Sequence, residues 1–243
     1  MCSQTHNEAL ARSATKGRKV ARLRLCETDG EQVTSCPWAR NMEYRCGCKN
    51  RAPTHLEKGG HMIGSYLSRL RDLLSCLPEQ EIERFVSLLA EARERGSWVY
   101  VFGNGGSATT AGHFACDLGK GTVAPGRPRF RVVTLHELAT FSAYANDCGY
   151  ETVFAEPLRS LARPGDVAIG ISASGNSENV LLAMEVAREL GLVTVGITGY
   201  QGGRLKGLVD LAIIVPSEDM QHIEDAHLVI LHAVFRALLD GDA

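Results

Sequence analysis

The feature that most limits the possible folds is a repeated alternation of short apolar segments with helical segments. Five apolar segments, rich in β-branched residues, are predicted strands at residues 98–102, 130–135, 166–171, 192–198 and 211–215. Helical spacing of apolar residues fills most of the intervening sequence. Buried strands that alternate with helices are typical of a parallel sheet covered on both faces. The sequence therefore predicts an α/β protein.

The predicted helices lie at residues 63–74, 79–95, 108–119, 138–146, 151–161, 178–190 and 219–239. Pro78 suits the first turn of the second helix, and Gly96 suits its end. The last helix carries apolar residues on most of its sides, which is typical of a buried helix. We expect this helix and the first one to be covered partly by other copies of the chain.

Residues 1–61 differ in composition from the rest. They hold 11 Lys and Arg against 6 Asp and Glu, and five of the eight cysteines. We interpret residues 1–61 as a basic, cysteine-containing extension that is disordered or not native, with Met62 as a plausible start of the domain at 62–243. The alternative is a zinc knuckle of Cys36, Cys46, Cys48 and His55, although Cys-x-Cys is not the usual ligand spacing.

Composition excludes several functional classes. No apolar run approaches the roughly 18–20 residues that a membrane helix needs, so no membrane partner is expected. The N-terminus lacks the apolar core of a secretory signal, which favours a cytoplasmic protein. The net charge is −2, and a partner of nucleic acid is not expected because phosphate backbones demand a basic surface.

Two loops rich in glycine and serine follow the first and third predicted strands. The first is Gly103-Asn104-Gly105-Gly106-Ser107, and the second is Ser172-Ala173-Ser174-Gly175-Asn176-Ser177. Glycines let backbone N–H groups approach an anion just before a helix, and the serines add hydroxyl donors. Ligands of such sheets bind beyond the carboxyl ends of the strands. The loops suit a phosphate and sugar hydroxyls, and the alternative is two tight turns with helix-capping serines.

Other phosphate-binding patterns fit less well. Neither loop contains a lysine, so neither is the phosphate loop of a nucleotide-hydrolysing enzyme. Residues 103–108 formally match the dinucleotide fingerprint G-x-G-x-x-A, with Glu137 as a candidate ribose-binding acid. A serine-rich second loop is not part of a dinucleotide site, which disfavours a nicotinamide enzyme.

Four side chains on two helices could form a metal site. His113 and Asp117 are four residues apart and share a helix face. Glu224 and His232 are eight apart, about 80° in rotation, and both could reach one site if the last helix lies across it. Two imidazoles and two carboxylates suit a zinc-like ion. The alternatives are a buried core histidine at 232 and a local helix pair at 113 and 117.

Taken together, these motifs resemble the SIS-domain phosphoheptose isomerase (D-sedoheptulose 7-phosphate isomerase) family, over about residues 63–240. The residues that carry the resemblance are Gly103–Ser107, His113-Phe114-Ala115, Asn146-Asp147, Ser172–Ser177, Glu224-Asp225-Ala226-His227 and His232. The resemblance implies a five-stranded parallel sheet flanked by helices, a flavodoxin-like three-layer sandwich. It also implies a homotetramer with active sites shared between subunits.

The resemblance further implies a site and a reaction. The family's histidine, glutamate, glutamine and histidine hold a zinc ion, which implies Zn²⁺ at His113, Asp117, Glu224 and His232. Asp117 or Glu224 would be the base and His232 the acid that convert D-sedoheptulose 7-phosphate into D-glycero-D-manno-heptose 7-phosphate through an enediol(ate). The implied substrate-binding residues are Asn104, Gly105, Gly106, Ser107, Asn146, Asp147, Ser172, Ala173, Ser174 and Ser177.

Two departures from the family pattern affect the roles of the carboxylates. Asp117 stands where glutamate is usual, and Glu224 stands where glutamine is usual. The change could strengthen metal binding, or it could move proton transfer from Asp117 to Glu224. An isomerase for another sugar phosphate is also compatible with these loops. Some relatives are instead non-catalytic adaptor proteins, including one that binds the bacterial replication initiator. They lose the final histidine, and the presence of His232 favours an enzyme.

Overall fold

The structure is a computed structural model that describes residues 62–240. Both interpretations of residues 1–61 therefore lie outside the described residues. The described chain confirms the predicted α/β fold. Its five strands form one parallel sheet in the order β2-β1-β3-β4-β5, with bounds β1 Trp98–Gly103, β2 Arg131–Thr134, β3 Val167–Ser172, β4 Val193–Thr198 and β5 Leu211–Ile214.

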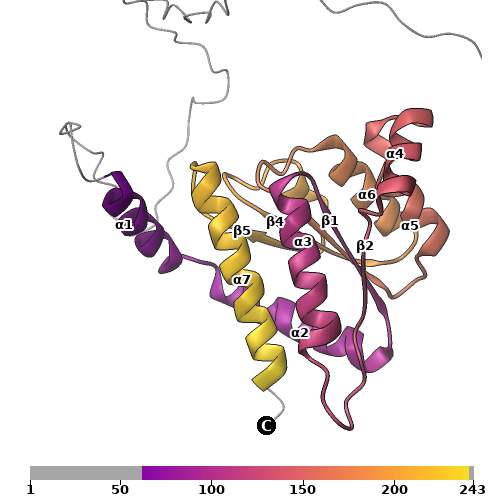
Figure 1. The fold of residues 1–243 in the computed structure, drawn as a ribbon, viewed down its shortest axis with the longest axis horizontal. Coiled ribbons are helices and arrows are strands. Elements are labelled where there is room, and N and C mark those ends of the chain that lie inside the picture. The colour runs from indigo at the N-terminus through magenta and orange to yellow at the C-terminus, as the bar shows by residue number, and fades with distance from the viewer. Residues whose placement is uncertain (1–61, 241–243) are drawn as a thin grey trace, which may run out of the picture. The chain divides into compact units, whose positions relative to one another are not determined.

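Helices connect these strands and cover both faces of the sheet (Figure 1). They are α1 Met62–Leu74, α2 Glu79–Arg95, α3 Gly106–Cys116, α4 Leu138–Asp147, α5 Ala155–Leu161, α6 Glu178–Glu189 and α7 Met220–Asp240. A π-helical turn, Asp117–Gly121, continues α3, and short 3₁₀ turns occupy Tyr150–Thr152 and Leu205–Gly207. None of the helices in residues 62–240 has the length and apolar character that crossing a membrane requires.

One predicted helix is shorter than its pattern indicates. The segment 151–161 begins with the 3₁₀ turn, and α5 starts only at Ala155. Pro157 stands at the third position of α5, where its missing N–H costs nothing because the first-turn amides have no intrahelical partner. Extending the helix further toward the N-terminus would set the proline ring against a preceding carbonyl. The proline therefore determines where α5 begins.

The alternation of side chains along the strands divides the core into two layers. On one face, Val99 and Val101 of β1 pack with buried residues of α2, α3 and α7. On the other face, Tyr100 and Phe102 pack with buried residues of α5 and α6. All six residues of β3 are buried, as expected for the central strand of a sheet covered on both sides.

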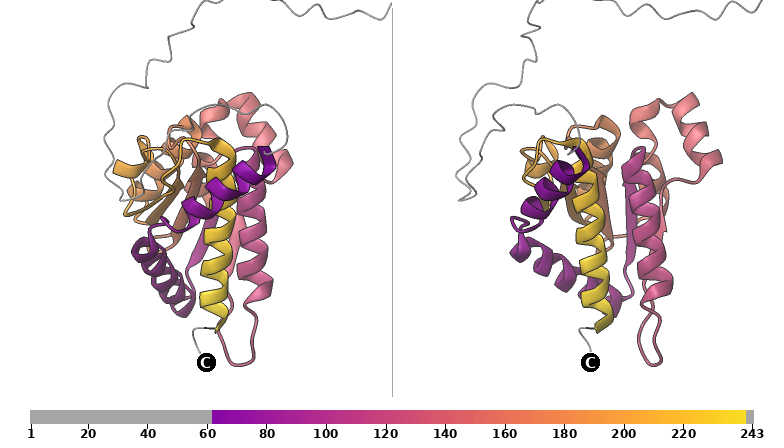
Figure 2. Two further views of the ribbon diagram at one scale, coloured as in Figure 1. Left: turned by 90° about the vertical axis from the view of Figure 1, so that its left-hand side faces the viewer. Right: turned by 60° about the vertical axis from the view of Figure 1, so that its left-hand side comes forward.

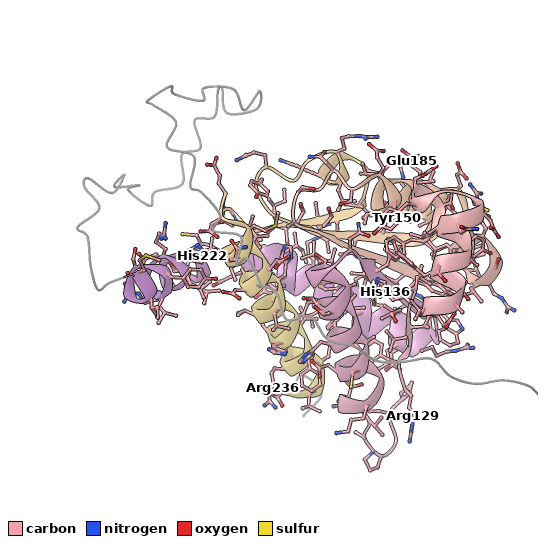
Figure 3. All side chains as sticks on the ribbon, turned by 45° about the horizontal axis from the view of Figure 1, so that its top comes forward. Arg129, His136, Tyr150, Glu185, His222 and Arg236 are labelled. Atoms are coloured by element: carbon pink, nitrogen blue, oxygen red, sulfur yellow. The ribbon has the colours of Figure 1, made fainter. Side chains whose placement is uncertain are left out.

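Helix α1 lies across the N-terminal half of α7 (Figure 2). Its Tyr66 hydroxyl donates to Asp225 at 2.5 Å, and the Nε2 of buried His222 lies 3.1 Å from the Tyr66 carbonyl oxygen. Figure 3 shows His222 at this junction. Within the single chain, Met62, Ile63 and Leu67 remain 86%, 77% and 57% exposed. The expected burial of this apolar surface between chains stays a prediction.

Candidate active site

The two glycine- and serine-rich loops lie side by side because β1 and β3 are neighbouring strands. In a sheet of this strand order, the chain leaves β1 and β3 in opposite directions, which opens a crevice at their carboxyl ends. The loops approach so closely that a Cβ on Gly103 would lie 2.6 Å from the Ile171 carbonyl oxygen. Only glycine fits at this position, so the contact with β3 determines where the first loop begins.

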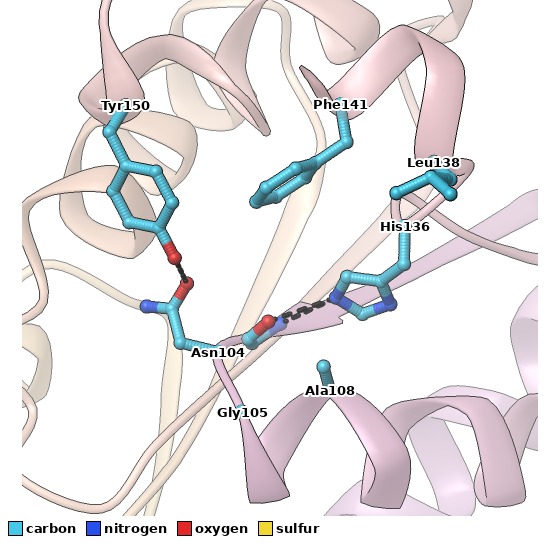
Figure 4. Close-up of a pocket in the computed structure, with 8 residues that line it drawn as sticks. Asn104, Gly105, Ala108, His136, Leu138, Phe141 and Tyr150 are labelled. Carbon is cyan, nitrogen blue, oxygen red and sulfur yellow. Dashed lines mark hydrogen bonds between the residues drawn. The ribbon is translucent and has the colours of Figure 1, made fainter. Parts of the chain in front are cut away.

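A reciprocal pair of side-chain amides joins the first loop to the start of α6, the helix that follows the second loop. Asn104 Nδ2 donates to Asn179 Oδ1 at 2.9 Å, and Asn179 Nδ2 donates back to Asn104 Oδ1 at 2.8 Å. The Tyr150 hydroxyl also donates to Asn104 Oδ1 at 2.9 Å (Figure 4). The Asn104 side chain, predicted to bind substrate, is thus engaged in holding the loop. The sequence analysis missed Asn179 and Tyr150, although a 2% exposed asparagine in an apolar helix is a recognisable signal once burial is known.

Hydrogen bonds fix the second loop, but none of them comes from the Ser177 side chain to the first amides of α6. Ser172 and Ser177 share a hydroxyl hydrogen bond at 3.0 Å. Ser177 occupies the N-cap position of α6 and makes no side-chain capping bond, which speaks against the capping interpretation. Gly175 has φ +63° and its carbonyl accepts from Leu205 N at 2.9 Å. The helix N-terminus with its positive dipole end therefore stays available to an anion.

Helices α3 and α7 bring three predicted site residues together. The Nε2 atoms of His113 and His232 lie 3.0 Å apart, and Asp117 Oδ2 lies 3.4 Å and 3.9 Å from them respectively. The imidazoles are half exposed, at 50% and 46%, and Asp117 is 22% exposed. Tetrahedral ligands of a zinc ion lie about 3.3 Å from one another, so this donor set fits zinc with a position left for another ligand. These three residues form the one such metal-compatible group in residues 62–240.

Glu224 lies elsewhere, over the start of α3. A Cβ on Gly106 would lie 2.9 Å from Glu224 Oε1, so the half-buried carboxylate sits against the backbone of the first glycine loop. Glu224 and His232 are eight residues apart on α7, about 12 Å along the axis. The carboxylate at the start of α3 is therefore separated along the helix axis from the His113 and His232 imidazoles. Metal ligation by Glu224 stays a prediction.

The predicted sugar-binding pair, Asn146 and Asp147, ends α4. Both side chains are exposed, and Asn146 Nδ2 donates to Asp147 Oδ1 at 2.7 Å. Neither side chain lines the cavity beside the first loop. Glu137, the candidate ribose-binding acid, caps α4 by accepting from Ala139 N at 3.1 Å and Thr140 N at 2.8 Å, and these bonds lower its pKa. Because both Glu137 oxygens are bound to these amides, the dinucleotide interpretation has no free acidic residue for the ribose.

A cavity of about 200 Å³ lies against the first loop (Figure 4). Leu138, Phe141 and Ala108 give it apolar walls, and His136 closes it at the end of β2. The Nε2 of His136 lies 3.3 Å from the Gly103 amide nitrogen and 2.9 Å from the Gly103 oxygen. Burial lowers the pKa of His136 and so favours the neutral ring. The sequence analysis did not single out His136, although its place directly after a predicted strand was a usable signal.

Another histidine, His227, lies on the buried face of α7. His227 is 1% exposed, and its Nε2 has no hydrogen-bond partner among the residues that the structure describes. Burial lowers the pKa of His227 to about 4, against a smaller opposing effect of its hydrogen bond with the Thr198 backbone. The fold therefore holds this imidazole neutral near pH 7.

Comparison with known proteins agrees with the family resemblance and the fold. The pattern of the SIS domain matches residues 65–199. The phosphoheptose isomerase of Helicobacter pylori (strain P12) is 42% identical over 164 residues, which are 67% of this chain and 84% of that protein. The solved phosphoheptose isomerase of Francisella tularensis has a TM-score of 0.68 at 29% identity and covers 74% of this chain and 96% of its own. That of Neisseria gonorrhoeae has a TM-score of 0.67 at 27% identity, with 72% and 96% covered.

Replacing Asn179 tests the amide pair. Asn179→Ala leaves the Asn104 amide donor unpaired at a part-buried position, and we expect the free energy of unfolding to fall by about 2 kcal/mol. Tyr150→Phe removes one exposed bond and should cost less than about 1 kcal/mol. Urea denaturation of both variants measures the difference. Equal, small losses in the two would contradict the role of the pair.

His227 predicts a loss of stability in mild acid. Its pKa is lower in the folded state than the usual 6.5, so only the unfolded chain takes up a proton as the pH falls below 6.5. Between pH 7.5 and pH 5 this residue should remove about 2 kcal/mol of stability. Urea denaturation at the two pH values should show a smaller acid loss in His227→Gln than in the unaltered chain. An unchanged pH dependence in that variant would show that His227 is not the group responsible.

Proposed function

The chain belongs to the SIS domain family and is a sugar-phosphate isomerase, and on that premise we propose that it converts D-sedoheptulose 7-phosphate into D-glycero-D-manno-heptose 7-phosphate. The observation that carries the proposal is the convergence of His113, Asp117 and His232 on two helices that begin at the loop edge of the sheet. The names of the similar proteins from Helicobacter, Francisella and Neisseria support a heptose phosphate as substrate.

The two loops divide the binding of the substrate. We assign the phosphate to the second loop, where the hydroxyls of Ser172, Ser174 and Ser177 surround the uncapped start of α6 and Ala173 adds backbone. The first loop offers its exposed backbone at Gly105 and Gly106 to the sugar hydroxyls, and Ser107, whose side chain is buried, follows in the first turn of α3. Asn104 orients that loop through its amide pair. Asn146 and Asp147 add polar groups that face solvent on α4.

Proton transfer needs a base beside the carbon next to the carbonyl and an acid beside the oxygens. Glu224 is positioned for the first task, because its carboxylate lies at the glycine loop where the sugar is expected. Asp117 lies beside two imidazoles, which suits a ligand, and His232 is the candidate acid for the carbonyl or hydroxyl oxygen whenever its Nε2 is not bound to the metal. A zinc ion held by His113, Asp117 and His232 would supply Lewis-acid polarisation of those oxygens.

The separation of Glu224 from the histidines favours an active site shared between subunits. Within one chain, Glu224 points toward the loop edge, and the histidines lie about 12 Å further along α7. A two-fold pairing of α3 and α7 with another copy would bring Glu224 of the partner subunit to the histidine group of the first. We therefore propose a homotetramer with shared sites, in which the exposed apolar face of α1 takes part in the contacts.

The reaction is tested by incubating the full chain with sedoheptulose 7-phosphate and following aldoheptose 7-phosphate by NMR. We expect conversion that falls on chelation and returns with zinc, and that is lost in His232→Gln with the circular dichroism spectrum unchanged. Sugar-phosphate binding without turnover by the zinc-loaded protein would favour a non-catalytic binding protein. Turnover of another ketose phosphate in preference to the heptose would assign a different substrate to the same chemistry.

Glu224 and the shared site are tested together. Glu224→Gln restores the amide that is usual in the family and should lower kcat at least about 100-fold if Glu224 is the base. Subunits of Glu224→Gln and His232→Gln, mixed and reassembled, should regain part of the activity, because some sites then combine two intact halves. Activity retained by Glu224→Gln would move the base to Asp117. No recovery on mixing would place the whole site within one chain.

A further inference from the structure

A second cavity lies at the amino ends of the strands, whereas the two loops lie at their carboxyl ends. It has a volume of about 330 Å³ and surrounds the amino ends of β1 and β2 and the approach to β3. We call it the arginine cavity, after Arg95, Arg131 and Arg163, which line it together with Trp98, Ser97 and Asp166. Strand β1 runs from Trp98 to Gly103, so roughly 16 Å of extended chain separates this cavity from the first glycine loop.

Each of the three arginines lies at or next to the end of a different helix or strand. Arg95 is the last residue of α2, where it pairs with Glu91 at 3.3 Å on an exposed surface. Arg131 begins β2, places its guanidinium 4.8 Å from the centre of the Trp98 ring and donates to the Gly96 oxygen at 3.3 Å. Arg163 follows α5 and is exposed, and its guanidinium has no ion-pair or hydrogen-bond partner within residues 62–240.

The acidic residue of the lining does not neutralise these cations. Asp166 is 6% exposed, and its two oxygens accept from the backbone amides of Trp98 at 2.8 Å and Arg163 at 2.9 Å. Its carboxylate therefore joins the starts of β1 and β3, and it forms no ion pair with any of the three guanidinium groups in the described chain. An excess of positive charge remains in this hollow, although residues 62–243 carry 22 acidic against 15 basic side chains.

Attraction to helix ends explains only part of this arrangement. Arg95 in the last turn of α2 and Arg131 at the Gly96 carbonyl both balance the negative end of that helix. Arg163 donates its guanidinium to no carbonyl of α5 in the described residues. A guanidinium presents paired N–H donors that match a phosphate group, and Arg163 lines the cavity with its guanidinium unpaired within residues 62–240.

We propose that the arginine cavity binds a small phosphorylated molecule, at a site separate from the isomerase loops. The volume lies within the range of small-molecule sites, and it is too small for a folded partner. The guanidinium groups, the Ser97 hydroxyl and the backbone make the lining polar, which excludes an apolar ligand. The Arg131 guanidinium already covers one face of the Trp98 ring, so the phosphate and not an aromatic ring is the group that is recognised.

Trp98 provides a local reporter for the test. The chain contains two tryptophans, Trp38 and Trp98, so Trp38→Phe leaves the cavity residue as the only one. Inorganic pyrophosphate is titrated into this full-length variant while the Trp98 fluorescence is followed, with sodium chloride at matched ionic strength as the control. We expect a saturable change that sodium chloride does not reproduce. Adding Arg95→Gln and Arg163→Gln should weaken the binding about tenfold.

The controls separate this site from the catalytic loops. Arg95 and Arg163 have no part in the proposed isomerase site, so heptose phosphate turnover should be unchanged in the double variant. A Trp98 signal that persists undiminished in the double variant would mean that pyrophosphate acts from the catalytic loops. No saturable signal, or one that sodium chloride reproduces, would show that the arginine cavity does not recognise phosphate. Either result would overturn the proposal.

Discussion

The close approach of β1 and β3 is the constraint on which the rest of the site depends. These strands are neighbours in the sheet although 63 residues separate the end of β1 from the start of β3, and the first loop can follow β1 only because residue 103 has no side chain. Both glycine- and serine-rich loops are thereby brought to one crevice. Helices α3 and α6 start there, which directs two sets of first-turn amides and two positive dipole ends into the same space.

The metal-compatible group depends on that first contact in turn. Because α3 leaves the crevice beside α7, His113 and Asp117 on one helix meet His232 on the other. The same pairing puts Glu224 at Gly106, a full two turns nearer the loop edge. One chain therefore places the Glu224 carboxylate at the first loop and the metal-compatible group further along the helices. This separation is the physical basis of the proposed site shared between two subunits.

Buried polar groups give the site its rigidity. Asn104 and Asn179 satisfy each other across the crevice, which fixes the relative position of the loops with no charge involved. His227 and His136 are both held toward the neutral form by burial. A neutral lining leaves the charge of the phosphate and of the carboxylates as the dominant electrostatic terms near the loops. At the other edge of the sheet the arginine cavity has the opposite character, since its guanidinium groups have no acidic partner within the lining.

The sequence by itself determined the class of fold and the order of its elements, because strands and helices are encoded by local spacing of apolar residues. It located both loops, and it showed that His113 and Asp117 share a helix face, since both features depend on neighbours in the chain. Only the tertiary structure decided which distant side chains meet. Asn104 with Asn179, Tyr150 with Asn104, and Glu224 with Gly106 are contacts between elements far apart in sequence. Such contacts depend on strand order, helix packing and side-chain tilt, which no local pattern records.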